Sequence, residues 1–202
     1  MITMAKRRRR KQSAYEFKPD PKGTNFLKRL YMTRLQRLTL FKWGAYALTG
    51  IALLVIQDVI MSGVRFSGAT TDLPVAFILL VGLYEGLENG SVFTLAAALF
   101  YWFSGSAPTP VCIALLCVLN VFIGLFRQMY WNRSFGSLAL CAAISIMLYE
   151  MLLFAAGILM GLTILPRAGV FALTGAFTCI TMLPMYPLVR VISKIGGESW
   201  ND

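Results

Sequence analysis

Few side chains in this 202-residue chain could do chemistry, and most of them lie in apolar runs. The chain has no histidine, and its four cysteines form no CxxC pair. A zinc site or a cysteine–histidine nucleophile is therefore excluded, because the nitrogen ligand or base is missing. We interpret the cysteines as small apolar packing residues. They are Cys112, Cys117, Cys141 and Cys179.

Paired acids of the kind used in acid–base catalysis are not evident either. Glu85 and Glu88 are three residues apart, but we expect them in a turn over 85–89 at the inner membrane surface. The chain also has no phosphate-binding P-loop and no GxSxG sequence. We therefore predict that the protein is not an enzyme and that it holds no metal and no cofactor.

Two acids interrupt apolar segments, and charged residues at membrane depth usually have a function or a partner. Glu150 follows Tyr149 in the middle of such a segment. Its carboxyl either locks helices together, contacts a partner protein, or handles a proton or solute. Asp58 follows Gln57 near the end of another segment, where its side chain can also reach the outer surface.

These residues need a membrane to position them. The chain is 57% hydrophobic and 14% charged, whereas a soluble domain carries about 25% charged residues. A membrane-spanning helix needs about 20 apolar residues. The apolar runs predict an all-α integral membrane protein with a six-helix domain over 43–195 and a cytoplasmic tail over 196–202. The six spans are expected at 43–61, 74–84, 90–103, 111–130, 138–162 and 170–191, the second and third being short.

The distribution of charge predicts the orientation. Thirteen of the 19 lysines and arginines lie in residues 1–42, where Glu16 and Asp20 are the acids. With six spans and an inner N-terminus, 17 basic residues fall on the inner side and two, Arg65 and Arg167, on the outer side. This distribution follows the positive-inside rule. We therefore predict a multi-pass protein of the plasma membrane with both termini cytoplasmic.

The N-terminal region divides into two predicted parts. Residues 1–22 form a disordered basic arm, and residues 23–42 form a basic amphipathic helix. This helix either lies in the interface or runs straight into the first span. For the basic residues, contact with anionic lipid is favoured over nucleic acid because a membrane domain follows at once. The lipid contacts are expected from Arg7, Arg8, Arg9, Arg10, Lys11, Lys28, Arg29 and Arg37, with Lys42 on the same polar face.

Small residues recur every four positions at Gly82, Gly86 and Gly90, and Thr94 and Ala98 extend the row. Small residues at this spacing let membrane helices approach closely. The row predicts either internal packing with a glycine-assisted turn at Gly90, or the face of a homodimer or partner contact.

Four sequence features occur in the order and spacing of a known family. They are Leu-Val-Ile-Gln57 at the end of the first span, Pro74 before a long aliphatic run, the row Gly82-x3-Gly86-x3-Gly90 followed by Ser104-Gly105, and Tyr149-Glu150. From about residue 53 onward, over about 140 residues, the chain resembles MreD, the rod shape-determining membrane protein of bacteria. Many members have an aspartate where this chain has Tyr101, so that residue's role is not carried over.

The resemblance implies a bacterial inner-membrane protein whose six-helix fold is similar to the substrate-binding subunits of energy-coupling-factor vitamin transporters. It implies a non-catalytic scaffold of the cell-elongation complex that binds MreC, a single-span protein, and through it reaches the peptidoglycan polymerase and transpeptidase and the MreB filament. A vitamin-binding transporter subunit is the alternative. We expect helix packing or partner contact from Gln57, Asp58, Pro74, Gly82, Gly86, Gly90 and Glu150.

Overall fold

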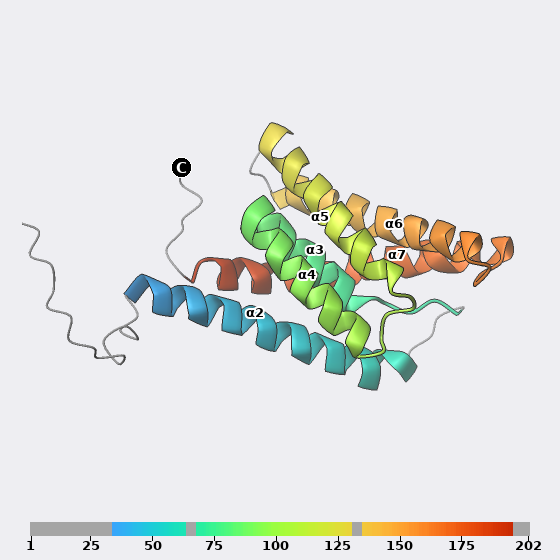
Figure 1. Cartoon of the computed structure of the whole chain (residues 1–202), viewed down its shortest axis with the longest axis horizontal. Helices are drawn as coiled ribbons and strands as arrows, with labels where there is room; N and C mark the ends of the chain where they lie inside the picture. Colours follow the sequence, from blue (N-terminus) through green and yellow to red (C-terminus); the bar gives the residue numbers. More distant parts are fainter. Residues whose placement is uncertain (1–33, 64–67, 131–134, 196–202) are drawn as a thin grey trace, which may run out of the picture. The chain divides into compact units, whose positions relative to one another are not determined.

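The computed structural model describes residues 34–63, 68–130 and 135–195, and they form an all-helical unit without β-strands. Figure 1 shows the order of its helices along the chain. The α-helices are α2 (Arg34–Val59), α3 (Leu73–Glu85), α4 (Leu87–Phe103), α5 (Val111–Tyr130), α6 (Phe135–Leu159) and α7 (Ala168–Ser193). Short 3₁₀ turns lie at Met61–Gly63 and Leu165–Arg167. The prediction of an all-α fold is confirmed.

Three helical segments are long and apolar enough to cross a membrane: Gln36–Val59, Gly136–Leu159 and Leu165–Ser193. The other helices are shorter or less uniformly apolar. With 13 residues, α3 rises only about 20 Å, whereas a bilayer core is about 30 Å thick. Composition and helix length therefore support a membrane protein. Three of its helical segments are long and apolar enough to span a membrane on their own.

Each predicted span overlaps one described helix, and α5 begins and ends where the sequence predicted. Helix α2 runs without a break from Arg34 to Val59, across the predicted boundary at residue 42. The alternative, in which the amphipathic helix runs straight into the first span, fits this continuity. The arm over 1–22, the residues 23–33 and the tail over 196–202 lie outside the described residues, as do Arg7 to Lys11, Lys28 and Arg29.

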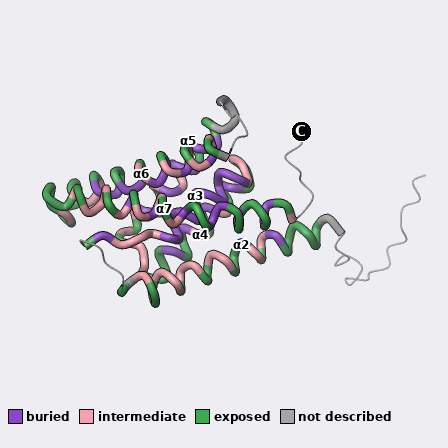
Figure 2. The backbone as a smooth tube through the Cα atoms, turned by 180° about the vertical axis from the view of Figure 1, so that it is seen from behind, coloured by how far each residue is buried: buried purple, intermediate pink, exposed green. Residues whose placement is uncertain are grey.

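Helix α3 lies at the centre of the described unit. It packs against α2, α4, α5, α6 and α7, and every residue from Leu73 to Tyr84 is buried. Figure 2 shows this burial along the tube of α3. A helix that is apolar on all sides has no polar face to give to water. This composition is compatible with the interior position of α3.

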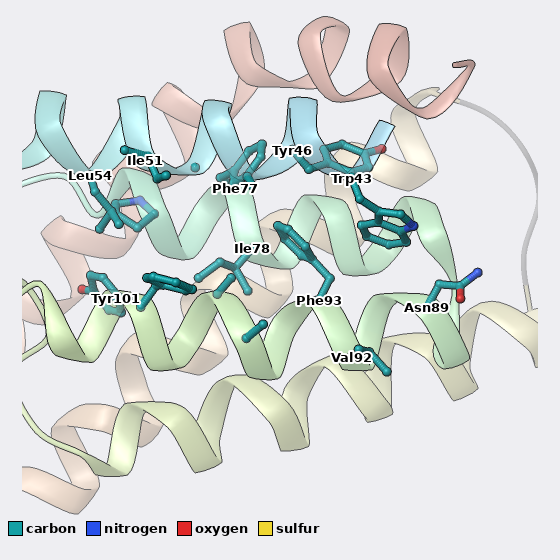
Figure 3. A pocket seen from close by; sticks show the side chains of 16 residues that line it. Trp43, Tyr46, Ile51, Leu54, Phe77, Ile78, Asn89, Val92, Phe93 and Tyr101 are labelled. Carbon is teal, nitrogen blue, oxygen red and sulfur yellow. The ribbon is translucent and has the colours of Figure 1, made fainter. Parts of the chain in front are cut away.

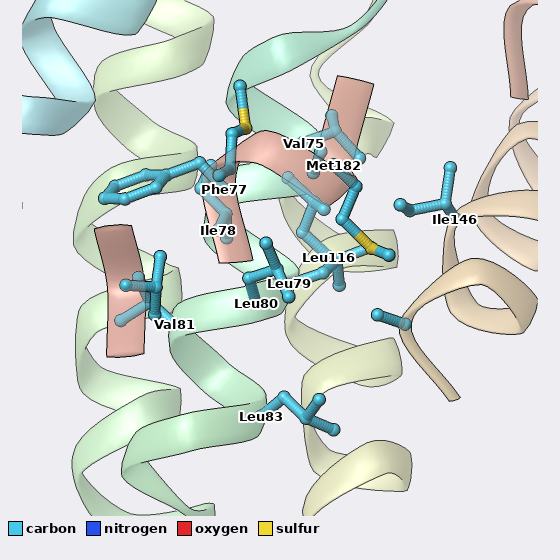
Figure 4. Close-up of a cluster of buried hydrophobic side chains, with 14 of the residues drawn as sticks. Val75, Phe77, Ile78, Leu79, Leu80, Val81, Leu83, Leu116, Ile146 and Met182 are labelled. Atoms are coloured by element: carbon cyan, nitrogen blue, oxygen red, sulfur yellow. The ribbon is translucent and has the colours of Figure 1, made fainter. Parts of the chain in front are cut away.

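Side chains from the surrounding helices pack against α3 (Figure 4). Leu116 of α5, Ile146 of α6 and Met182 of α7 are almost completely buried and belong to the same core cluster as Val75 and Leu79 of α3. Lipid tails are as apolar as these side chains, so burial alone does not drive the association. The stabilisation comes from close packing, which makes the fit between small and large residues decisive.

The connection between α3 and α4 is a single residue. Gly86 has a φ of 84°, a left-handed conformation that glycine adopts without strain. The turn is therefore shorter than the predicted range of 85–89, and α4 begins at Leu87. The glycine that turns the chain is Gly86, and Gly90 lies inside α4.

The row of small residues lies between α3 and α4. A Cβ atom on Gly90 would approach the backbone oxygen of Gly82 to 2.8 Å. A Cβ atom on Gly82 would overlap the side-chain amide of Asn120 in α5. Gly82 and Gly90 are buried, as are Thr94 and Ala98 further along α4. Their positions favour internal packing over a homodimer or partner face.

We predict that Gly90→Ala destabilises the protein, because the obstructing atoms belong to the backbone of α3 and cannot rotate away. Overpacking of this kind costs about 1–3 kcal/mol, which lowers the thermal unfolding midpoint in detergent. Gly44→Ala is the matched control, since a Cβ atom there has no neighbour within 4 Å. Equal midpoints for the two variants would contradict the close approach of α3 and α4.

Candidate functional site

A buried ion pair joins the start of α2 to the end of α3. The ammonium of Lys42 lies 2.5 Å from Oε2 of Glu85, and the two side chains are 8% and 4% exposed. The hydroxyl of Tyr46 donates a hydrogen bond of 2.8 Å to Oε1 of the same carboxylate. The Lys42 ammonium also lies 5.8 Å from the ring of Trp43. We name Lys42, Tyr46 and Glu85 the ion-pair cluster.

The ion-pair cluster corrects two expectations from the sequence. Lys42 was placed on the exposed polar face of an interfacial helix, but its side chain is buried against α3. Glu85 was placed in a surface turn, but it ends α3 as a partner of two side chains. The signal in the sequence was the opposite charge of two residues, one just before the first expected span and one just after the second. Arg37 is exposed, and its contact with anionic lipid stays a prediction.

The other end of α3 is tied to α2 by one side-chain amide. Gln57 donates from Nε2 to the backbone oxygen of Thr71 at 2.5 Å. Its Oε1 accepts the backbone N–H of Leu73 at 3.2 Å. Helix α3 begins at Leu73 with Pro74 in its first turn, and proline suits this position because it has no N–H to satisfy. Gln57 and Pro74 are thus both parts of the start of α3.

Asp72, which precedes α3, joins two further helices at this end. Its Oδ2 accepts a hydrogen bond of 2.7 Å from the hydroxyl of Tyr101 in α4. Its backbone N–H donates to Oγ1 of Thr178 in α7 at 2.9 Å. We name Gln57, Asp72, Tyr101 and Thr178 the amide–acid cluster. Tyr101, at the position where many MreD members have an aspartate, thus contacts an acid from another segment.

Asp58 lies beside this cluster and is exposed. Its Oδ1 accepts a hydrogen bond of 2.7 Å from Ser106, in the link between α4 and α5. Asp58 therefore holds the link between α4 and α5 at the end of α2. It lies at the surface, as the sequence predicted, and also makes a contact within the chain.

Burial raises the pKa of Asp72 from its ordinary value of 3.8 to about 6, against the opposing hydrogen bond from Tyr101. Its Oδ1 is buried and has no hydrogen-bond partner among the described residues. The carboxyl of Glu150 also interacts with it electrostatically. A desolvated acid with one unpaired oxygen favours the protonated form.

Glu150 is 2% exposed in α6. A Cβ atom on Gly175 of α7 would lie 3.3 Å from Cγ of Glu150, so the acid packs at the contact of α6 with α7. Its Oε1 has no hydrogen-bond partner among the described residues. This position favours an internal role over contact with a partner protein. Tyr149, which precedes it, is fully buried.

An apolar groove of about 500 Å³ lies between α2 and α4, with α3 beneath it. Figure 3 shows Trp43 and Asn89 toward one end and Leu54 and Tyr101 toward the other. The sequence did not reveal this groove, because it depends on how far apart α2 and α4 lie. Aromatic residues at helical spacing on two segments were the available signal.

The described residues therefore hold polar clusters at both ends of α3, an interior acid and an apolar groove. Together they define an all-helical protein with three segments long and apolar enough to cross a membrane. No group of three potential metal ligands occurs among the described residues. No family model, curated protein or solved structure significantly matches this chain.

We predict that Glu85→Gln destabilises the protein strongly, because it leaves the Lys42 ammonium buried without its counter-charge. Breaking one partner of a buried pair costs about 3–5 kcal/mol. The double variant Lys42→Met with Glu85→Gln recovers most of this loss, because no buried charge then remains. Glu88→Gln, three residues further on and exposed, is the matched control. Chemical unfolding in detergent measures all four proteins, and equal losses in the single and double variants would contradict the pairing.

We predict that Asp72 makes stability fall as pH rises. Its pKa is about 6 in the folded protein and 3.8 ordinarily. Its stabilising effect is therefore complete below about pH 3.8 and is lost as pH rises to about 6. Thermal unfolding midpoints between pH 4 and 7.5 measure this slope. Asp72→Asn removes it, whereas Asp58→Asn keeps it, and an unchanged slope in Asp72→Asn would assign the effect to another group.

Proposed function

We propose that this protein is a non-catalytic membrane scaffold of the bacterial cell-elongation complex, similar to MreD, and that it binds an MreC-like single-span protein. The observation that carries this proposal is the order and spacing of the four family-like features. In the fold they occupy related places: Gln57 and Pro74 at the start of α3, the glycine row between α3 and α4, and Glu150 inside α6.

The polar contacts support a scaffold over an enzyme. The ion-pair cluster and Gln57 direct their polar atoms to other groups of the chain. Such contacts hold helices in place and present no reacting group to a substrate. Through its partner, this scaffold supports lateral peptidoglycan synthesis by the polymerase and transpeptidase, and connects with the MreB filament.

We propose a six-span topology in the inner membrane, with both termini in the cytoplasm. Its support is the count of 17 basic residues against two. The short helix α3 is enclosed by the other helices, so its ends need not reach the lipid headgroups unaided, and α4 crosses beside it. The ion-pair cluster then lies toward the cytoplasmic side and the amide–acid cluster toward the outer side.

The alternative is a vitamin-binding subunit of an energy-coupling-factor transporter. A vitamin site needs polar groups that orient the ligand within a cavity. The groove has an almost entirely apolar lining. The hydroxyl groups of Tyr46 and Tyr101, which line it, already donate to Glu85 and Asp72. This arrangement disfavours the transporter alternative.

We predict that the tagged full-length protein, solubilised in mild detergent, co-purifies the MreC-like protein encoded by the same genome in saturable fashion. An unrelated single-span protein expressed at the same level is the control. Failure to associate with the MreC-like protein would overturn the scaffold proposal. Tight binding of a vitamin by the purified protein would favour the transporter instead.

A further inference from the structure

Two acids approach the same turn of α7 from different elements. The backbone N–H of Asp72, before α3, donates to Oγ1 of Thr178 at 2.9 Å. Glu150 of α6 packs against Gly175, where a Cβ atom would lie 3.3 Å from Cγ of Glu150. Gly175 and Thr178 are three residues apart on one helix, so they share a face and lie about 4.5 Å apart along its axis. The fold thus brings the two acids into one region of the interior, where they interact electrostatically.

Three polar atoms of this region are buried and have no hydrogen-bond partner among the described residues. They are Oδ1 of Asp72, the hydroxyl oxygen of Tyr149 and Oε1 of Glu150. Tyr149 is fully buried and interacts electrostatically with both acids, so its hydroxyl faces the same region. Buried polar atoms normally have a partner. Three unpartnered atoms together therefore indicate a binding site for a small polar ligand.

The surroundings of the two acids provide no positive charge. Titratable groups from four helices face them: Tyr101 of α4, Cys112 of α5, Tyr149 of α6 and Cys179 of α7. From α2 comes the neutral amide of Gln57. No lysine or arginine in the described part of the chain interacts with either acid. The described residues also hold no group of three potential metal ligands, so the cation that this site fits is a proton.

The surroundings also decide which acid keeps a proton more firmly. Two carboxylates in one desolvated region repel each other, so ionisation of one disfavours ionisation of the other. The ionised form of Asp72 is favoured by the hydrogen bond from Tyr101 and by its place at the N-terminus of α3. Glu150 lies inside α6, away from a helix N-terminus, and its Oε1 has no donor among the described residues. The last proton of the two acids therefore stays on Glu150.

We propose that Asp72 and Glu150 form a proton-binding pair, in which Glu150 holds one proton at neutral pH and Asp72 takes up a second from water as the pH falls. The proton makes Glu150 a hydrogen-bond donor in a region where Oδ1 of Asp72 is an unpaired acceptor. The pair joins the start of α3 to the contact of α6 with α7, so proton uptake and release act on the packing of these helices. This site goes beyond the scaffold function and does not depend on which protein the scaffold binds.

Infrared spectroscopy tests the pair, because the carbonyl stretch of a protonated carboxyl group is separate from the bands of a carboxylate. The full-length protein is measured in a detergent without ester groups. At about pH 7.5 we expect one protonated carboxyl in the wild type and none in Glu150→Gln, and at about pH 5 a second one that Asp72→Asn lacks. Asp58→Asn, an exposed acid beside the amide–acid cluster, is the matched control and keeps both. Absence of the band from the wild type at the higher pH, or its persistence in Glu150→Gln, would overturn the proposal.

Coupling distinguishes a pair from two independent acids. Asp72→Asn removes the negative charge beside Glu150, so the remaining proton is released more easily. We expect the carboxyl band of Glu150 to disappear at a pH about one unit lower in Asp72→Asn than in the wild type. Asp58→Asn leaves this midpoint unchanged. An unchanged midpoint in Asp72→Asn would overturn the pairing.

Two further measurements use the wild type alone. Carbon-13 in the side-chain carboxyls of all glutamates shifts the band of Glu150 to lower frequency and leaves that of Asp72 in place, which covers the case that Glu150→Gln does not fold. A band at about pH 7.5 that the label does not shift would overturn the assignment to Glu150. Titrations in sodium chloride and in potassium chloride test a metal cation as the occupant. We expect equal midpoints in both salts, and a midpoint that depends on the cation would overturn the proton site.

Discussion

The structure depends on the burial of α3, which is apolar on all sides and too short to cross a bilayer alone. The other five described helices surround it. Lipid provides little hydrophobic driving force for this enclosure. The enclosure therefore relies on packing, on small residues such as Gly82 and Gly90, and on polar contacts at the two ends of α3.

The two ends of α3 are held by different chemistry. At one end, a buried charge pair joins α2 to α3, and loss of either partner would leave the other charge buried and unpaired. At the other end, Gln57 and Asp72 connect α2, α4 and α7 to the start of α3 through directional hydrogen bonds. Together they fix α2 antiparallel to α3. Lys42, in the first half of α2, pairs with Glu85 at the end of α3, and Gln57, near the end of α2, binds the start of α3. The groove over α3 is the space that these fixed ends leave between α2 and α4.

The sequence predicted the helices well because their signals are local. The apolar run over 111–130 indicated α5, and Pro74 indicated the first turn of α3. Sequence reasoning placed the turn of the hairpin wrongly, because Gly86 and Gly90 look alike until one of them adopts a positive φ. It also missed the ion-pair cluster, because Lys42 and Glu85 lie far apart in the sequence and their spacing does not predict that they meet. The pairing of Asp72 with Tyr101 was missed for the same reason, and the groove follows only from three-dimensional separation.

The burial of Lys42 has a consequence for biosynthesis. The lysine emerges from the ribosome 43 residues before Glu85, which at about 5–20 residues per second amounts to roughly 2–9 s. During this interval α2 has no counter-charge, so the ammonium must remain at the headgroups by extending its stem toward water. Arrival of the α3–α4 hairpin draws it inward. The first helix of the body thus reaches its final depth only after the second, which ends at Glu85, has been synthesised.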